Sequence, residues 1–144
     1  MHLQIYITTQ ELILAIITIN GKKYNDKRLN SKGKKQLQSL RIIEDEINSI
    51  NKKIMINKTS RSVYGTAIMK NIPEKTAAAN RKNGIVTIND KKYLEADLNT
   101  KMKNDILVLK NIDKNLSNLH INLAIANTAK NVYTQALLES LENK

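Results

Sequence analysis

Few residues in this chain of 144 have the types and spacing that catalysis or metal binding requires. The two histidines, His2 and His120, lie far apart, and neither has a Cys or a carboxylate at ligand spacing. Glu44, Asp45 and Glu46 are consecutive, so on a helix their carboxylates point in different directions and cannot form a catalytic pair. We expect them to face solvent, with Glu44 or Glu46 pairing with a lysine. Cysteines, Gly-rich phosphate loops and serine nucleophile elbows are absent, so the sequence predicts a protein that is not an enzyme and has no cofactor or metal site.

A cluster of basic residues is the strongest charge feature. The chain has 24 Lys and Arg against 13 Asp and Glu, a formal net charge of +11, and residues 1–72 hold 13 of the basic and 5 of the acidic residues. The basic cluster consists of Lys22, Lys23, Lys27, Arg28, Lys32, Lys34 and Lys35. It indicates an anion site for nucleic acid or for an acidic protein partner. Two observations favour a merely solvated surface instead: Tyr24 is the one aromatic residue nearby, and the abundance of Lys, Asn and Ile is typical of AT-rich coding drift.

The basic cluster overlaps a sequence that occurs twice. Thr18 to Tyr24 returns as Thr87 to Tyr93, and a shift of 69 positions aligns the following residues without a gap. This predicts a leader at 1–15, a first copy at 16–72, a linker at 73–84 and a second copy at 85–144. The tyrosines at matching positions are Tyr24, Tyr64, Tyr93 and Tyr133. We expect them to pack within the fold, and the alternative is that one pair contacts a neighbouring subunit.

Each copy begins with the signals of a β-hairpin and then of a helix start. Asn20-Gly21 lies between β-prone runs and is typical of a type I′ turn, whereas Asn89-Asp90 is a poorer turn pair and predicts a looser hairpin or another turn type. Asn30 and Asn99 each stand where a helix N-cap is expected. The fold class is therefore mainly α with short β-hairpins (α+β), a tandem repeat of a hairpin followed by a long amphipathic helix.

The helices carry an apolar seam with steps of 3, 3, 4, 3 and 4 residues, which is close to a heptad pattern. The seam residues are Leu37, Leu40, Ile43, Ile47, Ile50, Ile54, Ile106, Leu109, Ile112, Leu116, Leu119 and Leu123. We expect these residues to pack one helix along another. Beyond Ile54 and Leu123 the stripe drifts, as a straight helix requires. It continues in the first copy through Ile56, Val63, Tyr64, Ala67 and Ile68, and in the second through Ile125, Val132, Tyr133, Ala136, Leu137 and Leu141.

Two features decide how long the helices are and how they run. We expect one helix of about forty residues per copy, and the alternative is a break at Asn57-Lys58-Thr59-Ser60 that would give a helical hairpin. Pro73 closes the first helix. The linker that follows is too short to return along such a helix, so the two helices are expected to run antiparallel or to lie end to end.

The leader is open to two interpretations. Leu3 to Ile7 alternates weakly enough to be a strand, and Thr8 to Glu11 has the form of a helix capping box. The apolar run Leu12 to Ile17 is too short to span a bilayer, and the residues before it contain no Lys or Arg as a signal peptide would. We therefore expect no membrane span and no recognisable signal peptide, and a location in the cytoplasm or in a virion.

Several motifs resemble a small domain of unknown function that is encoded by marine bacteria, cyanobacteria and their phages. They are Thr18 to Tyr24, Leu29-Asn30, Gln36 to Leu40, Glu46-Ile47, and Thr59 with Tyr64. The resemblance implies a β-hairpin followed by a long helical segment, here present twice, at about 16–72 and 85–144. The family has no assigned activity, so no catalytic residue carries over, and its acidic residues after the N-cap are replaced here by Lys32, Lys34 and Lys35.

Long amphipathic helices without catalytic chemistry indicate a structural or assembly protein. We expect it to form a homo-oligomer or to dock with other proteins of a larger particle, in the narrowest version as a component of a phage virion. The alternative is a basic accessory protein that binds or packages nucleic acid through the basic cluster.

Overall fold

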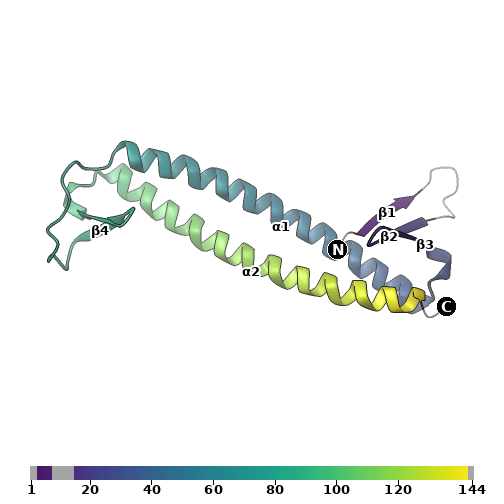
Figure 1. Ribbon diagram of the computed structural model, residues 1–144. Coiled ribbons are helices and arrows are strands. Elements are labelled where there is room, and N and C mark those ends of the chain that lie inside the picture. Colours follow the sequence, from purple (N-terminus) through teal and green to yellow (C-terminus); the bar gives the residue numbers. More distant parts are fainter. Residues whose placement is uncertain (1–2, 8–14, 143–144) are drawn as a thin grey trace. The chain divides into compact units, whose positions relative to one another are not determined.

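The computed structural model describes residues 3–7 and 15–142 of the chain, and most of them are helical (Figure 1). In chain order the elements are β1 (Leu3–Ile7), β2 (Ala15–Ile19), β3 (Lys22–Asn25), the 3-10 helix η1 (Asp26–Arg28), α1 (Ser31–Lys70), β4 (Ile85–Ile88), β5 (Lys91–Leu94), the 3-10 helix η2 (Glu95–Asp97) and α2 (Thr100–Glu142). The expected class is confirmed at this level: two short antiparallel hairpins, each followed by a long helix.

Both hairpins turn in the same way. Asn20 and Gly21 have φ values of 51° and 79°, and Asn89 and Asp90 have values of 48° and 63°. Positive φ at both central residues is the requirement of a type I′ turn. The expectation of another turn type in the second hairpin is therefore wrong, since Asp tolerates the left-handed region well enough when strand pairing holds it there.

The strand interpretation of the leader is confirmed. β1 pairs antiparallel with β2, from Leu3 opposite Ile19 to Ile7 opposite Ala15, and gives a three-stranded sheet in the order β1-β2-β3. The capping box expected at Thr8 to Glu11 lies outside the described residues.

Both long helices begin at the expected caps. The side-chain oxygen of Asn30 accepts a hydrogen bond from the backbone N–H of Gly33 at 2.8 Å, and that of Asn99 accepts one from Met102 at 2.7 Å. Each bond satisfies one of the N–H groups that a helix start leaves without an intrahelical partner.

The expected continuous helices are confirmed, with 40 residues in α1 and 43 in α2, and the alternative of a break at Asn57-Lys58-Thr59-Ser60 is wrong. The side chains of Asn57 and Thr59 donate to the carbonyls of Lys53 and Met55, four residues earlier. Thr128 does the same to Ala124 in α2. Residues that would favour a turn are thus accommodated inside the helix by bonding back to it.

The chain forms two compact units, and each combines residues from both long helices. Unit 1 consists of residues Met1–Lys52 and His120–Lys144, and unit 2 of Lys53–Leu119. Each unit therefore contains one hairpin, the first part of the helix that follows it, and the last part of the other helix. The boundaries of the two sequence copies stay a prediction, because compactness divides the chain in a different way.

The core of unit 1 joins the sheet to both helix segments. Leu40 and Leu137 are fully buried in it, so α1 and α2 pack against each other here. Its buried members are Ile17, Ile19, Tyr24, Leu29, Leu37, Leu40, Leu137 and Leu141. Leu40 near the start of α1 shares this core with Leu137 near the end of α2, and Glu44, further along α1, pairs with Lys130, which comes earlier in α2. The two segments therefore run in opposite directions, and the end-to-end alternative is wrong for this unit.

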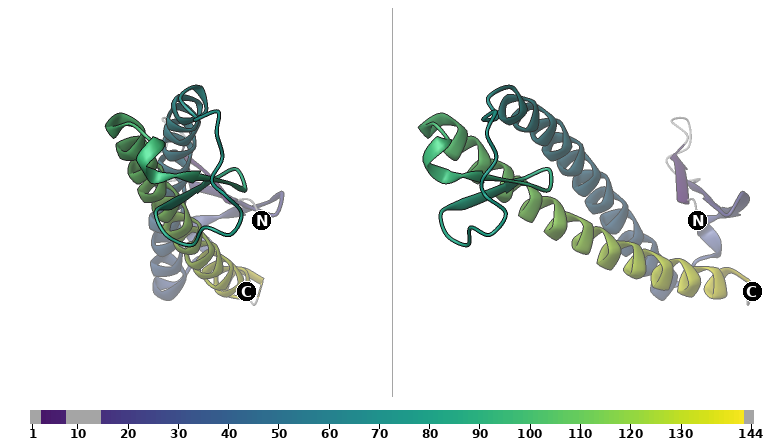
Figure 2. Two further views of the ribbon diagram at one scale, coloured as in Figure 1. Left: turned by 90° about the vertical axis from the view of Figure 1, so that its left-hand side faces the viewer. Right: turned by 60° about the vertical axis from the view of Figure 1, so that its left-hand side comes forward.

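The core of unit 2 is built from residues at matching positions. Ile68, Leu98 and Met102 are buried, and the half-buried residues against them are Ile72, Val86, Ile88, Ile106 and Leu109. A shift of 69 relates seven of these eight residues to members of the unit 1 core, and Met102 matches Gly33. The hairpin β4-β5 lies beside the end of α1 and the start of α2, as Figure 2 shows from two further sides.

Interhelical ion pairs also occupy matching positions. In unit 1 the Lys130 Nζ lies 2.6 Å from the Glu44 Oε1, and in unit 2 the Arg61 Nε lies 2.6 Å from the Asp113 Oδ1. A shift of 69 takes Glu44 to Asp113 and Arg61 to Lys130. A lysine partner for Glu44 was expected, and it comes from the other long helix.

Candidate binding surfaces

No group of three or more His, Asp or Glu side chains that could hold a metal ion occurs among the residues that the structure describes. His120 is exposed on α2. Within the same part of the chain, no helix is long and apolar enough to cross a membrane. The surfaces of interest are therefore those that could contact a macromolecule.

The seam is used inside the units. All twelve predicted seam residues are buried or half-buried, and none is exposed. Leu37 and Leu40 lie in the core of unit 1, and Ile106 and Leu109 pack against the core of unit 2. The seam is therefore the inward side of each helix, and its residues are less exposed than the apolar residues of the outward side.

A second apolar face lies on the side of α2 turned away from the core. This outer face of α2 is formed by Ile121, Ile125, Thr128, Val132 and Ala136, at steps of 4, 3, 4 and 4 residues. Ile121, Ile125 and Val132 are 56%, 63% and 63% exposed. At 3.6 residues per turn, the buried residues Thr134 and Leu141 point about 180° to 200° away from Val132.

The same residue types form an outer face on α1 within unit 2. Ile56, Thr59, Val63 and Ala67 are identical to Ile125, Thr128, Val132 and Ala136 at the shift of 69. Ile56 and Val63 are well exposed. The predicted drift of the stripe is therefore confirmed only in part. Ile68, Leu137 and Leu141 are buried as a continuation of the seam requires. The exposed residues Ile56, Val63, Ile125 and Val132 instead belong to a second apolar face, which is exposed in the part of the chain that the structure describes.

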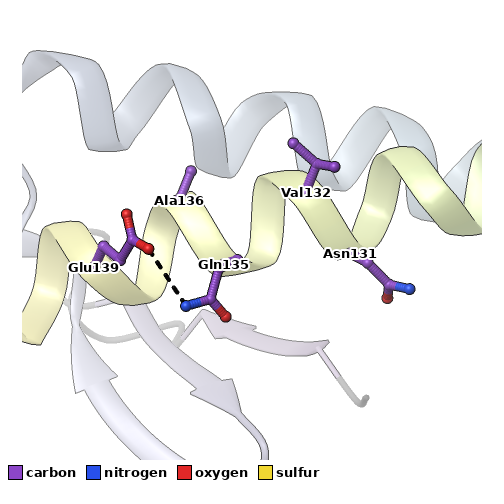
Figure 3. Close-up of a pocket in the computed structure, with 5 residues that line it drawn as sticks. All are labelled: Asn131, Val132, Gln135, Ala136 and Glu139. Carbon is purple, nitrogen blue, oxygen red and sulfur yellow. Dashed lines mark hydrogen bonds between the residues drawn. The ribbon is translucent and has the colours of Figure 1, made fainter.

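A shallow depression, open to solvent, lies on the outer face of α2 in unit 1 and is called the groove here. Figure 3 shows its lining: Asn131, Val132, Gln135, Ala136 and Glu139. Val132 and Ala136 project from the same side of the helix, and the Gln135 amide donates a hydrogen bond to the Glu139 carboxylate at 3.4 Å. The groove thus has an apolar floor and a polar rim, and all its lining residues come from one helix.

The two outer faces differ in the charge around them. Between His120 and Leu138, Lys130 is the only Asp, Glu, Lys or Arg, and it is engaged with Glu44. Residues 53–70 of α1 contain Lys53, Lys58, Arg61 and Lys70 and no acidic residue. The outer face of α2 is therefore neutral up to Glu139 at its end, in a strongly basic chain. The outer face of α1 is rimmed by the positive charges of Lys53, Lys58 and Lys70, and its Arg61 is engaged with Asp113.

The basic cluster is exposed and lies on unit 1, on β3, η1 and the first turn of α1. The Lys22 ammonium lies 5.5 Å from the centre of the Tyr24 ring, and an Arg28 Nη donates to the Leu141 carbonyl at 3.3 Å near the end of α2. The matching positions in unit 2 carry less charge: Ala96 and Asp97 replace Lys27 and Arg28.

The four tyrosines at matching positions differ in their exposure. Tyr24 and Tyr93 on the hairpins are 6% and 4% exposed, and Tyr24 belongs to the core of unit 1. On the helices, Tyr64 is half-buried and Tyr133 is 38% exposed, next to the outer face of α2. The hairpin pair is placed for packing within the fold.

The pattern of apolar residues in the sequence did not distinguish the outer faces from the seam, although two signals mark them. One is the spacing of seven residues between Ile56 and Val63 and between Ile125 and Val132, half a turn from the seam. The other is the absence of charge around the second pair. Neither signal says which of two apolar stripes on a helix is covered.

Comparison of the chain with models of protein families, with curated proteins and with solved structures finds no match. The resemblance to a hairpin-and-helix domain of phages and marine bacteria stays a prediction.

Proposed function

We propose that this chain is a non-enzymatic structural protein, built by tandem duplication of a hairpin-and-helix segment, that acts by docking its helices onto other protein surfaces. The observation that carries the proposal is the pair of outer faces. Within residues 51–72 and their counterparts, the identical residues are Ile56, Thr59, Val63, Tyr64 and Ala67, and four of these five form the outer face of α1.

The buried and half-buried apolar positions of the same segments differ between the copies. Ile54, Ile68 and Ile72 correspond to Leu123, Leu137 and Leu141. A folding requirement alone would preserve buried residues more than exposed ones, because core packing responds to changes in side-chain shape. Retention of the exposed residues supports a role for the outer faces beyond folding, and apolar exposed faces are typical of protein interaction sites.

Light-scattering-coupled gel filtration at low and high salt tests the proposal. We expect a mass above that of the monomer at high protein concentration, and we expect it to persist in salt, since apolar contacts are not screened. The double variant Ile56→Lys with Ile125→Lys should restore the monomer. A wild-type chain that stays monomeric at every concentration, alone and with candidate particle components, would contradict docking.

Nucleic-acid binding through the basic cluster is the second candidate, favoured by the exposure of its seven residues on one unit. Its test is the binding of short DNA at several salt concentrations, with Lys22→Ala and Lys23→Ala compared with Lys91→Ala and Lys92→Ala at the matching positions of unit 2. Binding through the cluster predicts an affinity that falls steeply with salt and is reduced only by the first pair.

The sharpest version of the main proposal places the protein in a phage virion, which also stays a proposal.

A further inference from the structure

We infer that the outer face of α2 in unit 1 binds the same face of a second copy of this chain, as an antiparallel helix pair. The inference rests on the proposed docking function and names the surface and the partner. It is argued from the shape of the groove, from charge and from symmetry.

The residues that line the groove have the spacing of one hole in a helix-to-helix interface. In such interfaces a side chain of one helix inserts between four residues of the facing helix, spaced i, i+3, i+4 and i+7. The lining of the groove contains this set: Val132, Gln135, Ala136 and Glu139. Ala136 is the small residue of this set, so a branched side chain of a facing helix can approach α2 closely there.

The same face supplies the side chains that would fill the hole. Ile121 and Ile125 are more than half exposed and lie on the same side of α2 as Val132. If two copies of α2 run antiparallel, with Ile125 of one opposite Val132 of the other, then Ile121 comes opposite Ala136. A large side chain then faces a small one at both ends of the contact, which is how packed layers interdigitate.

Charge favours a second copy as the partner. A twofold interface places each patch against itself, so a patch of one sign repels its own copy. In a chain of net charge +11, most surfaces would oppose self-association, but residues 120–138 carry only Lys130, which is already paired with Glu44. Depletion of charged residues is also the compositional mark of an interface core.

The one charge at the end of this face selects the antiparallel direction. A parallel pair would place the Glu139 carboxylate of one copy beside that of the other. In the antiparallel pair Glu139 lies beyond Ile121 of the second copy, away from its equivalent. A face of 16 residues is only about 24 Å long, so the interface is small and the dimer should depend on protein concentration.

Single cysteines test the inference, because the natural chain contains none. In the antiparallel register Thr128 lies next to the twofold axis, so in the Thr128→Cys variant the two thiols come close to each other. We expect oxidation of Thr128→Cys to give a disulfide-linked dimer in a concentration-dependent manner. The matched control is Thr59→Cys on the outer face of α1, which should stay monomeric because positive charge surrounds that face.

A second pair of variants tests the face without a disulfide. We expect Ile125→Lys to weaken dimerisation by at least about tenfold, since a substitution in a twofold interface acts twice. Ile56→Lys, at a position of similar exposure, should leave it unchanged. Both positions are exposed, so both variants should keep the helical content of the parent.

The outcomes separate this inference from the broader proposal. The α2 pairing is overturned if Thr59→Cys and Thr128→Cys cross-link equally. It is also overturned if Ile56→Lys abolishes self-association and Ile125→Lys does not. In both cases the broader docking proposal stands. Efficient self-cross-linking of both Ile121→Cys and Val132→Cys overturns the antiparallel register, because those positions meet themselves only in a parallel pair. A monomer at every concentration with no Thr128→Cys dimer overturns the pairing, and the docking proposal then depends on other particle components.

Discussion

The two ion pairs at matching positions should contribute differently to stability, because their side chains differ in exposure to water. In the Glu44–Lys130 pair the side chains are 28% and 17% exposed, whereas in the Arg61–Asp113 pair they are 54% and 49% exposed. Exposed pairs are surrounded by water and contribute little, and removal of one partner of a desolvated pair leaves a charge that the fold cannot solvate well. The two pairs should therefore respond differently to the same change.

We expect Glu44→Gln to lower the free energy of unfolding by about 1 kcal/mol or more, and Asp113→Asn to lower it by about 0.5 kcal/mol or less. Denaturant unfolding at low and high salt measures both. At about 1 M salt the effect of Asp113→Asn should vanish, because the screening length is then about 3 Å. Equal losses for the two variants at both salt concentrations would contradict this assignment.

At the scale of elements, the two units pack equivalent segments with one local difference. Gly33 in α1 is buried, and a Cβ atom there would lie 2.9 Å from the Leu29 Cδ2 and 3.0 Å from the Ser140 Oγ. The matching residue in unit 2 is Met102, which is itself buried and belongs to the core. The glycine lets the start of α1 lie close to the end of α2, and the methionine fills the corresponding space where it exists.

The core of unit 1 offers a matched pair of substitutions two residues apart on α1. Leu40 is fully buried, while Ile42 is 61% exposed. We expect Leu40→Ala to cost about 2 to 5 kcal/mol of stability, as a buried leucine does when it leaves a cavity, and Ile42→Ala to cost about 0.5 kcal/mol or less. Thermal or denaturant unfolding measures the difference. Similar losses would mean that Ile42 is covered in solution, for example by another protein.

At the scale of the whole molecule, neither copy contains a complete unit. The hairpin β4-β5 packs with the end of α1, and the sheet of unit 1 packs with the end of α2. A single copy therefore lacks the helix end that its own hairpin requires. This arrangement supports a duplicated chain in which each copy completes the other.

We expect an excised fragment of the linker and the second copy, residues 73–144, to fold as a homodimer in which each chain supplies the end of α2 to the other. Sedimentation equilibrium gives its mass, and circular dichroism gives its helical content as a function of concentration. Dissociation should be accompanied by loss of helix, since the helix end would lose its apolar partner. A helical monomer would show that the copy folds alone and would contradict the exchange.

The sequence by itself determined the local elements. Asn30 and Asn99 as N-caps, the hairpins at Asn20-Gly21 and Asn89-Asp90, and the length of both helices follow from backbone preferences and from periodicity, which act between residues close in the chain. The seam was also predictable, and all its members are covered. The turn at Asn89-Asp90 and the drift through Val63 and Val132 were misjudged, because propensity and period do not include the strand pairing or the packing partner.

Only the tertiary structure decided which apolar residues remain exposed. Val132 and Leu137 have similar hydrophobicity and lie on one helix, yet Leu137 is fully buried and Val132 is 63% exposed. The difference arises because a helix presents its side chains around a full circle, and only the sector that faces a neighbouring element loses its contact with water. The position of that neighbour depends on long-range packing, such as Leu40 against Leu137, and this separates the covered seam from the face that we assign to docking.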